Sequence, residues 1–296
     1  MQERYSNVYI LLPVHNRRAI TEKFIDCLVA QTYSNYHLIL IDDGSSDSTD
    51  EMVRAKVSKL TVIRGQGDWW WAGSLQKGVD WLKRNGVEDQ DVVVFMNDDV
   101  IFERDFLHTA LAVLDHQAGL LLPQVLNKKT GLIEDSGVEA DLKKLTFKTA
   151  MTPEKINCLP TRGLFMRMSD LRKIGGFYPR LLPHYLSDYE FTIRANRMGV
   201  HLMTSPKLLI SFDEETTGFR NFEGLSISEF MRRYFSIKSA SNPVYWTTFI
   251  LLTSPRLFMP WNILRIWLGA VKAILGQVMR TCFIQRKHVA CVPPKK

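Results

Sequence analysis

Val92-Val93-Val94-Phe95-Met96-Asn97-Asp98-Asp99 is the stretch of this 296-residue chain that decides its fold. Its five apolar residues predict a short strand buried on both faces of a sheet, and two adjacent carboxylates follow at its carboxyl end. Ligands of open α/β sheets bind just outside the carboxyl ends of the strands. Adjacent carboxylates repel each other unless positive charge lies beside them, so the stretch favours a divalent cation with a phosphate ligand. The alternative is an Asp-Asp turn exposed to solvent.

Strands and helices alternate on both sides of this stretch. We expect strands over residues 8–13, 36–41, 60–64, 92–96 and 119–123, with helices over 19–32, 48–57 and 103–117 and after the loop 65–73. The alternation predicts a parallel, doubly wound sheet. Beyond residue 124, strand-like pieces near 143–149, 158–168 and 200–212 and helices near 169–175 and 187–198 break this order. We place the boundary of this domain at residue 240.

A second acidic cluster, Asp42-Asp43-Gly44-Ser45-Ser46-Asp47, follows the strand at 36–41. Its carboxylates are suited to accept hydrogen bonds from a nucleotide base or a ribose hydroxyl, and Gly44 allows a sharp turn. The alternative is a capped turn, because Asp, Gly and Ser are common turn residues. Ser48, with Glu51 three residues later, predicts the cap of the following helix.

A third cluster, Ser187-Asp188-Tyr189-Glu190, opens a predicted helix that also carries Arg194. Asp188 in the first turn is suited to act as a general base facing the metal site. The alternative is a helix start that carries acids because its end is positive.

The amino-acid composition is that of a globular protein. A hydrophobic fraction of 46% supports a sizeable core, and the four scattered cysteines predict neither a zinc site nor a disulfide framework. The polar start of the chain predicts no signal peptide. Residues 230–296 contain eleven Lys and Arg and no Asp or Glu, which points to a polyanionic partner for the tail at 241–296.

The order of these motifs resembles that of the inverting family 2 glycosyltransferases of the GT-A fold, of the rhamnosyltransferase-like type that builds bacterial surface polysaccharide. The matching motifs lie at 12–17, 41–47, 65–73, 97–99, 161–165, 174–177 and 188–199, so the resemblance covers about residues 7–240. It implies an α/β fold with a single Rossmann-like, mostly parallel sheet flanked by helices. Residues 1–125 would form the nucleotide-sugar half and residues 126–240 the acceptor half, followed by an amphipathic helical extension.

The resemblance also implies roles for individual residues. Asp188 would be the catalytic base, and Asp99 would bind Mg²⁺ or Mn²⁺. A site made of oxygen ligands alone favours these ions over zinc. Asp42 and Asp43 would contact the base and ribose of a dTDP- or UDP-sugar. The expected donor-binding residues are Pro13, His15, Arg17, Asp42, Asp43, Trp70, Trp71, Ala72, Gly73, Ser74, Asn97 and Asp98. The expected acceptor-binding residues are Arg162, Gly163, Tyr189 and Glu190. At least one ring of Trp69-Trp70-Trp71 is expected in the core.

Three features depart from the family's pattern. Ser187 stands where a Glu usually precedes the catalytic Asp, and residues 210–214 lack the His that often completes the metal site, so Asp213 is the alternative ligand. The Gln-x-x-Arg-Trp motif of processive synthases is missing, with only Arg232-Arg233-Tyr234 in its place. The last absence favours a single transfer over polymer extrusion.

The tail contains a predicted helix at 261–284 with a wide apolar face and a narrow polar stripe. The stripe consists of Asn262, Arg265, Gly269, Lys272, Gly276 and Arg280. Regularly spaced basic residues favour a helix lying in a membrane interface over one that spans a bilayer. Docking on the catalytic domain or on a second subunit is the alternative, and nucleic acid is a weaker one.

These observations predict a metal-dependent, inverting transferase that adds a sugar to a lipid-linked saccharide. We expect a peripheral protein at the cytoplasmic face of the membrane. The sequence leaves open whether the protein forms homo-oligomers. A nucleotidyltransferase is the alternative enzyme, but it needs a Gly-rich phosphate loop that Pro13-Val14-His15-Asn16-Arg17-Arg18 does not provide. A non-catalytic tethering module is disfavoured by the intact acids.

Overall fold

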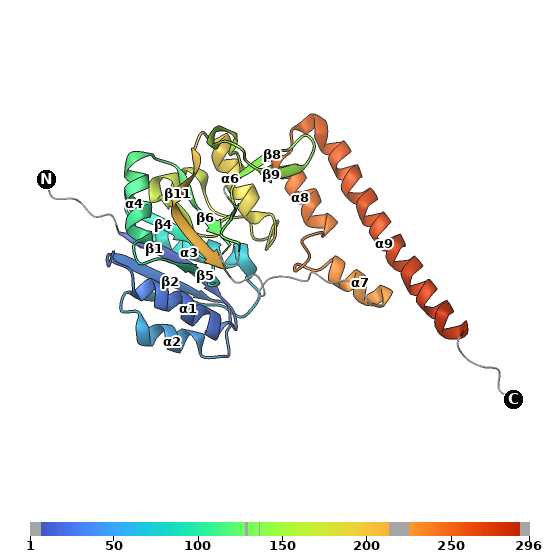
Figure 1. The fold of residues 1–296 in the computed structure, drawn as a ribbon, viewed down its shortest axis with the longest axis horizontal. Coiled ribbons are helices and arrows are strands. Elements are labelled where there is room, and N and C mark those ends of the chain that lie inside the picture. The colour runs from blue at the N-terminus through green and yellow to red at the C-terminus, as the bar shows by residue number, and fades with distance from the viewer. Residues whose placement is uncertain (1–6, 128–129, 136, 213–224, 291–296) are drawn as a thin grey trace. The chain divides into compact units, whose positions relative to one another are not determined.

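The computed structural model describes residues 7–127, 130–135, 137–212 and 225–290, which form two compact units (Figure 1). One unit comprises Met1–Asp141 and Thr146–Thr216, and the other comprises Leu142–Leu145 and Thr217–Lys296. This boundary lies earlier than residue 240, because helix α7 (Ile227–Tyr234) packs through Phe230 and Tyr234 on Ala270 of the C-terminal helix.

The first unit is built around a nine-stranded sheet with the order β3-β2-β1-β4-β10-β6-β11-β5, and β7 pairs with β6. The strands are β1 (Val8–Val14), β2 (Tyr36–Asp42), β3 (Leu60–Arg64), β4 (Val92–Phe95), β5 (Val100–Phe102), β6 (Leu120–Leu126), β7 (Ile133–Asp135), β10 (Leu164–Arg167) and β11 (Leu202–Phe212). Strands β1 to β4 run parallel to their neighbours, as β11 does to β6. β10 and β5 are antiparallel to their neighbours. A separate hairpin contains β8 (Val138–Asp141) and β9 (Thr146–Thr149). The predicted α/β class with a mostly parallel sheet is confirmed.

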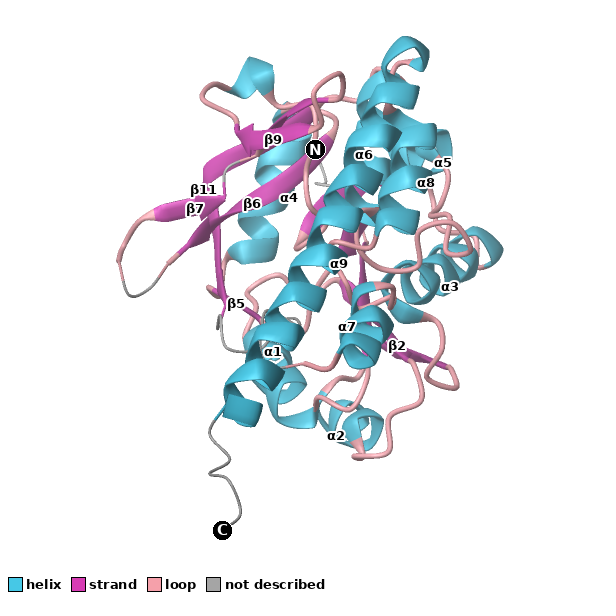
Figure 2. Ribbon diagram, turned by 90° about the vertical axis from the view of Figure 1, so that its right-hand side faces the viewer, coloured by secondary structure: helices cyan, strands magenta, loops and turns pink. Residues whose placement is uncertain are grey.

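Helices cover both faces of this sheet (Figure 2). They are α1 (Arg18–Val29), α2 (Thr49–Lys56), α3 (Trp70–Arg84), α4 (Phe106–His116), α5 (Met168–Ile174) and α6 (Ser187–Arg197), with a 3-10 turn at Pro153–Lys155. Successive residues of a strand point to opposite faces, so Leu12 packs with α1 and α4 while Leu11 packs with α3 and α6. The two hydrophobic cores bury both faces of the strands, which fixes where the loops that follow them begin.

Two local predictions were wrong. Ser48 does not cap α2: its φ is 59°, and Asp47 Oδ1 instead accepts hydrogen bonds from the backbone N–H and the hydroxyl of Thr49. The loop predicted over residues 65–73 ends earlier, because α3 already begins at Trp70.

The second unit contains α7, α8 (Pro243–Thr253), a 3-10 turn at Arg256–Phe258 and the 32-residue α9 (Met259–Ala290). The predicted helix at 261–284 is therefore present. Its predicted polar stripe is wrong at Asn262, which is fully buried and donates through Nδ2 to the carbonyl of Leu142 at 3.1 Å. Among the described residues, the segment Arg256–Thr281 is long and apolar enough to cross a membrane.

Candidate active site

Three parallel strands bring their carboxyl ends to one edge of the sheet. Val14 of β1 pairs with Asp42 of β2, and Leu11 of β1 pairs with Phe95 of β4. The segments that follow these strands carry the acids and bases singled out in the sequence. Pro13 lies within β1, partly buried, one residue before the strand ends. The sheet therefore gathers on one edge residues that are more than 80 positions apart in the chain.

Arg17 lies between the two carboxylates after β4. Its Nη1 is 3.0 Å from Asp98 Oδ1, and its Nη2 is 3.3 Å from Asp99 Oδ2. The other oxygen of Asp98 accepts a hydrogen bond from the Thr21 hydroxyl at 3.1 Å. Burial raises the pKa of Asp98 from 3.8 to about 6; Arg17 lowers this pKa and Asp99 raises it. The positive charge that two adjacent buried carboxylates require is thus supplied by the chain itself.

Three buried polar atoms of this region lack a hydrogen-bond partner among the described residues. They are Asp99 Oδ1, Asn97 Oδ1 and Arg162 Nε. Buried polar atoms are rarely left unpaired, and a ligand satisfies them in many functional sites. Asp99 Oδ1 is an oxygen ligand of the kind that Mg²⁺ and Mn²⁺ prefer.

The residues present could bind such a metal, but they provide few protein ligands for it. The described part of the chain contains no group of three or more His, Cys, Asp or Glu side chains suited to hold one. Mg²⁺ is commonly bound through one or two carboxylates, with substrate phosphates and water as its other ligands. Asp99, assisted by Asp98, meets that requirement. The alternative ligand, Asp213, lies outside the described residues.

Asp43 fixes the loop that leads into α3. Its Oδ1 accepts a hydrogen bond from the backbone N–H of Gly67 at 2.8 Å, and its Oδ2 accepts from those of Trp69 and Trp70. His15 donates through Nδ1 to the Asp43 carbonyl at 2.6 Å, so the other ring nitrogen is free to accept from Asn16 Nδ2 at 3.2 Å. Asp43 therefore joins the loops after β1, β2 and β3, through its carbonyl to His15 and through its buried carboxylate to Gly67, Trp69 and Trp70.

The turn after Asp42 can be made only by glycine. Gly44 has a φ of 75°, and a Cβ there would lie 2.8 Å from the backbone of Gln66 and Gly67. The turn directs the backbone N–H of Ser45 to Asp42 Oδ1 at 2.8 Å. The second oxygen, Asp42 Oδ2, takes part in no hydrogen bond with the residues that the structure describes, which leaves it available to a ligand.

The Trp-rich segment forms the first turn of α3. Trp69 and Trp71 pack against the core, which confirms that at least one ring is structural. Trp71 Nε1 donates to the Thr161 hydroxyl at 3.3 Å, and the Trp70 ring lies 6.0 Å from that of His184. The next three residues, Ala72, Gly73 and Ser74, are buried in the helix. Their geometry favours shaping this turn over direct contact with a ligand.

Asp188 is the second residue of α6. The helix is preceded by Leu186 with a φ of 69°, and Ser187 Oγ donates to the His184 carbonyl at 2.6 Å. Asp188 Oδ1 accepts a hydrogen bond from the backbone N–H of Tyr189, whose ring lies 5.3 Å from that of Phe147. The loop before α6 touches α3, because the Pro183 carbonyl accepts from Ala72 N at 3.0 Å. These contacts connect Asp188 to the turn that Asp43 holds.

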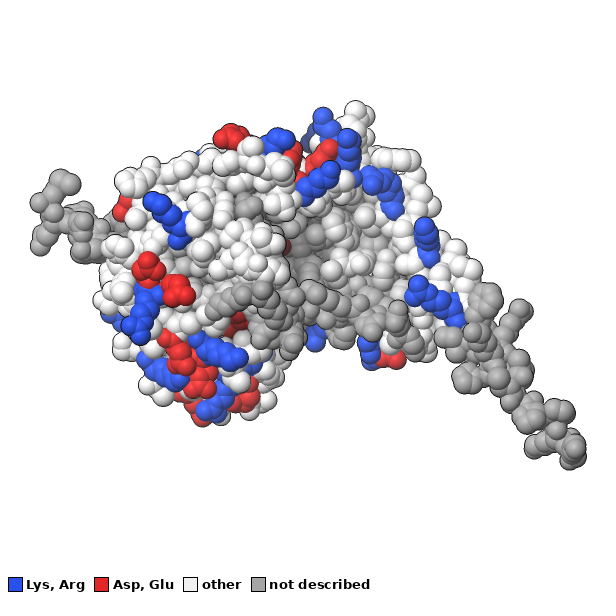
Figure 3. Space-filling model, viewed as in Figure 1, with Lys and Arg blue, Asp and Glu red and all other residues white. Residues whose placement is uncertain are grey.

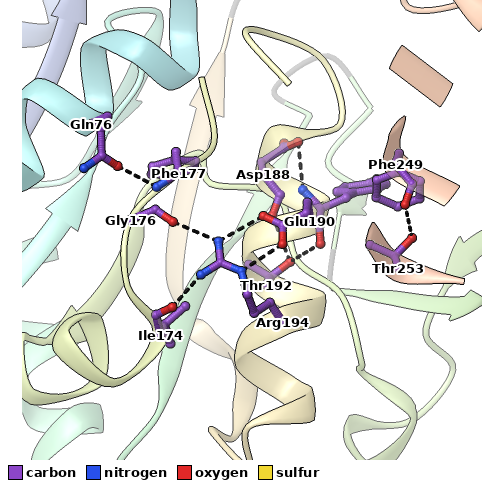
Figure 4. Close-up of polar contacts among 11 residues, drawn as sticks. Gln76, Ile174, Gly176, Phe177, Asp188, Glu190, Thr192, Arg194, Phe249 and Thr253 are labelled. Atoms are coloured by element: carbon purple, nitrogen blue, oxygen red, sulfur yellow. Dashed lines mark hydrogen bonds and ion pairs between the residues drawn. The ribbon is translucent and has the colours of Figure 1, made fainter. Parts of the chain in front are cut away.

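Glu190 and Arg194 form a two-armed ion pair on α6 (Figure 4). Arg194 Nε donates to Glu190 Oε1 at 2.8 Å, and Nη2 donates to Oε2 at 2.9 Å. The same guanidinium donates to the carbonyls of Ile174 and Gly176. From the other side, Gln76 Oε1 of α3 accepts from Phe177 N at 2.7 Å. Both oxygens of Glu190 are thus occupied, which favours a positioning role over contact with an acceptor.

Arg162 and Gly163 lie at the start of β10, beside the end of β4. Gly163 donates to the Phe95 carbonyl at 2.9 Å, and its φ of 79° excludes most other residues. The guanidinium carbon of Arg162 lies 4.1 Å from the centre of the Phe212 ring. Arg162 therefore adds positive charge near the acids of β4, where an anionic ligand would fit.

Three further residues of this region were given no role from the sequence, although Thr161 opens the matching motif at 161–165. Thr21, Gln76 and Thr161 each donate or accept one of the hydrogen bonds described above. Only their partners in the folded chain identify them. Thr21 follows Arg17 by four positions, so a helix starting at residue 18 could have suggested that both face the same acids.

The family model described as Glycosyl transferase family 2 matches residues 9–175, which is more than half of the chain. The match includes the segments after β1, β2 and β4 and the start of β10. It ends before α6, so Asp188 and Glu190 lie outside the matched residues.

Curated relatives with similar sequences are named as glycosyltransferases. The amylovoran biosynthesis glycosyltransferase AmsB of Erwinia amylovora is 23% identical over 232 residues, covering 74% of this chain and 73% of that protein. A PGL/p-HBAD biosynthesis glycosyltransferase of Mycobacterium tuberculosis is 26% identical over 239 residues, covering 76% of this chain and 82% of its own.

Solved structures share the fold at low sequence identity. The mannosyltransferase PcManGT of Pyrobaculum calidifontis, in complex with GDP-Man and Mn²⁺, has a TM-score of 0.54 and 17% identity, covering 98% of this chain and 82% of its own. TarS of S. aureus, in complex with UDP-GlcNAc, has a TM-score of 0.57 and 15% identity, covering 88% of this chain and 71% of its own. These similarities confirm the predicted GT-A architecture.

Proposed function

The chain belongs to glycosyl transferase family 2, and from this premise we propose that it transfers a sugar from a nucleotide-sugar donor to a saccharide hydroxyl, with inversion at the anomeric carbon. The observation that carries the proposal is the sheet edge where Arg17 holds Asp98 and Asp99 while Asp99 Oδ1 stays buried without a partner among the described residues. A ligand that brings positive charge and phosphate oxygens would complete this arrangement.

Donor recognition falls to the loops after β1 and β2. Asp42 Oδ2 is available to accept a hydrogen bond from the base or ribose, and Asp43 keeps the surrounding backbone in place. Arg17 and Arg162 supply positive charge for the diphosphate. We propose a dTDP- or UDP-sugar, rhamnose among the candidates; the fold neighbours crystallised with GDP-Man and UDP-GlcNAc support a nucleotide sugar in general.

Charge develops on the leaving nucleoside diphosphate as the sugar–phosphate bond breaks. Mg²⁺ or Mn²⁺ bound through Asp99 would supply electrostatic stabilisation of that charge. Asp188 would accept the proton of the attacking hydroxyl from its position in the first turn of α6, where its Oδ1 also accepts a hydrogen bond from Tyr189 N. Such a base typically contributes about 10²–10⁴ in rate.

We place the reaction in bacterial polysaccharide or glycolipid synthesis, with a lipid-linked saccharide as acceptor, at the cytoplasmic face of the plasma membrane. Relatives named for the biosynthesis of amylovoran and of PGL/p-HBAD support this role. The basic tail is consistent with a peripheral membrane protein.

Replacement of the proposed base tests the mechanism. We expect Asp188→Asn to lower turnover by about 10²–10⁴ while the dissociation constant of the donor with Mn²⁺ stays within about twofold. Asp105→Asn is the matched control, because Asp105 is an exposed acid at the start of α4 without a side-chain cap hydrogen bond. Near-normal turnover of Asp188→Asn would remove Asp188 from the mechanism.

A donor panel identifies the substrate. Thermal stabilisation by dTDP-, UDP- and GDP-sugars, measured with Mn²⁺ and with a chelator, should single out one nucleotide sugar. A nucleotide sugar that binds only the folded protein raises its free energy of unfolding, by about 2.7 kcal/mol at a ligand concentration a hundred times the dissociation constant. Stabilisation by no nucleotide sugar under either condition would contradict the proposed reaction.

A further inference from the structure

Helix α9 has one buried face, which combines two polar side chains with apolar packing around Ala270. Asn262, Ala270 and Gln277 are nearly inaccessible to solvent. Asn262 Nδ2 donates to the Leu142 carbonyl, and Gln277 Nε2 donates to the Leu225 carbonyl at 2.7 Å. These bonds attach α9 to other parts of the C-terminal unit and fix which side of the helix is turned outward.

The opposite face of α9 is apolar and exposed. Trp261, Leu268 and Met279 are 59%, 57% and 58% exposed. They belong to a stripe with spacings of three and four residues, which at about 100° per residue lies on one side of the helix. We call it the outer stripe; its members are Trp261, Leu264, Leu268, Val271, Leu275 and Met279. A contiguous exposed apolar surface of this kind marks an interaction site.

Basic residues border the outer stripe along one edge. Arg265, Lys272 and Arg280 each follow a stripe residue by one position, and all three are exposed. Figure 3 shows basic side chains following one another along this helix. The sequence from residue 230 onward holds no acidic residue to neutralise them. The partner must therefore offer apolar and anionic groups together.

We propose that the outer stripe of α9 inserts into the surface of an anionic phospholipid membrane, with the helix lying in the membrane plane. The basic edge would contact lipid phosphates while the apolar side chains enter the acyl boundary. This inference rests on the proposed function, which places the enzyme at a membrane, and it names the surface that binds the lipid. Its test, however, measures vesicle binding and needs no transfer reaction.

A second copy of the chain fits this surface less well. Two outer stripes packed against each other would bring the basic edges close together, with no acidic partner on either α9. Like charges that face each other across an interface oppose association. Charge therefore favours an anionic lipid surface as the occupant.

A membrane-spanning arrangement also fits less well. The 26-residue segment Arg256–Thr281 is long enough to cross a bilayer. Spanning would place Asn262 and Gln277 in hydrocarbon and break the bonds that each makes to a backbone carbonyl. Arg265 and Lys272 would also enter the bilayer core. Lying flat keeps the buried face docked, lets the apolar side chains enter the acyl boundary and leaves the basic residues at the lipid phosphates.

Flotation of the full chain with vesicles tests the proposal. We expect the protein to float with phosphatidylcholine–phosphatidylglycerol vesicles, to float poorly with phosphatidylcholine alone, and to be released by carbonate at high pH. Leu268→Glu should weaken binding about tenfold or more, and Lys272→Glu roughly fivefold. Matched controls are Met151→Glu and Arg104→Glu, which replace an apolar and a basic residue by Glu at exposed positions of the first unit.

Three results would overturn the proposal. Leu268→Glu that floats as well as the unchanged protein would exclude the outer stripe. Resistance to carbonate would indicate a spanning helix. A protein that does not float, but dissociates from a larger to a smaller species in light scattering on Leu268→Glu, would identify a second copy as the occupant. Loss of transferase activity in a protein that still floats would count against the proposed function alone.

Discussion

The negative charge of Asp98 is energetically unfavourable in the folded protein. The side chain is buried beside Asp99, and Arg17, Thr21 and a backbone N–H offset part of the cost of its negative charge. Its pKa is therefore raised from 3.8 to about 6. A divalent cation near Asp99 would favour the charged form, so the same carboxylate that costs stability in the metal-free protein contributes to metal binding.

This raised pKa predicts how stability depends on pH. In the unfolded chain the Asp pKa is about 3.9, so between about pH 4 and pH 6 the folded state holds a proton that the unfolded state has released. The stabilisation is complete below about pH 4 and is lost as pH rises through about 6. The two-unit shift corresponds to about 2–3 kcal/mol of unfolding free energy. Asp98→Asn should remove this dependence.

Urea unfolding with a chelator, from about pH 4.5 to about pH 7.5, measures the effect. The informative quantity is the difference between the two proteins, because other groups titrate equally in both. Asp68→Asn, at an exposed acid, serves as control. Parallel stability curves for Asp98→Asn and the unchanged protein would show that Asp98 holds no extra proton in the folded state between about pH 4 and pH 6.

The acids themselves could be predicted from the sequence, but their partners could not. Asp42, Asp43, Asp98 and Asp99 follow apolar runs, so their place at the sheet edge depends on local pattern alone. Which oxygen is free depends on bonds to distant residues, such as those of Asp43 to Gly67 and Trp69. Glu190 illustrates the limit, because the sequence motif does not reveal that Arg194 occupies both of its oxygens.

Helix α6 is held by contacts with two neighbouring elements. Arg194 reaches the carbonyls of Ile174 and Gly176 after α5, and Gln76 of α3 holds Phe177 in the same turn. A Cβ on Gly176 would lie 2.0 Å from Gln76 Oε1, so the turn leaves no room for a side chain. The Glu190–Arg194 pair therefore sets the position from which α6 presents Asp188.

Glu190→Gln separates positioning from acceptor binding. If Glu190 positions α6, the variant should lose about 1–3 kcal/mol of stability and turnover should fall, while the Michaelis constant for the acceptor changes little. Chemical unfolding and steady-state kinetics on the same preparations measure both. Glu229→Gln is the matched control: Glu229 makes the same i,i+4 pair with Arg233 on α7, but is more exposed. There the stability loss should be below about 0.5 kcal/mol.

A different result would restore the role first predicted for Glu190. A raised Michaelis constant for the acceptor with unchanged stability would mean that its carboxylate contacts substrate.

Elements with a clear apolar run or helical repeat could be predicted, whereas β5, β7 and β8 could not. Strands β1 to β4 follow apolar runs, and α9 follows a long helical repeat. Strands β5, β7 and β8 contain three or four residues and depend on their partners: β7 and β8 pair with the neighbouring strands β6 and β9, and Phe102 of β5 pairs with the distant Ile210. The antiparallel direction of β10 is likewise set by its neighbours β4 and β6.

The division of the chain into two units depends on contacts that cannot be predicted from its composition. The basic tail is visible in the sequence, yet the second unit also takes in α7 and the four residues Leu142–Leu145. Ser254 and Asn262 both donate to the Leu142 carbonyl, and Arg265 donates to that of Lys144. The tip of the β8–β9 hairpin thus belongs with helices more than 100 residues later in the sequence.

A division of labour between the units predicts how activity depends on the acceptor. If the first unit performs the chemistry and α9 holds the enzyme at the lipid surface, Leu268→Glu with Leu275→Glu should leave turnover of a water-soluble acceptor within about twofold. Turnover of a lipid-linked acceptor in anionic vesicles should fall by about 10²-fold, because binding at the surface raises the effective concentration of one reactant for the other. Met151→Glu should change neither rate. Equal losses on both acceptors would mean that the substitutions disturb the catalytic unit, and no loss on the lipid-linked acceptor would mean that catalysis does not need α9 at the membrane.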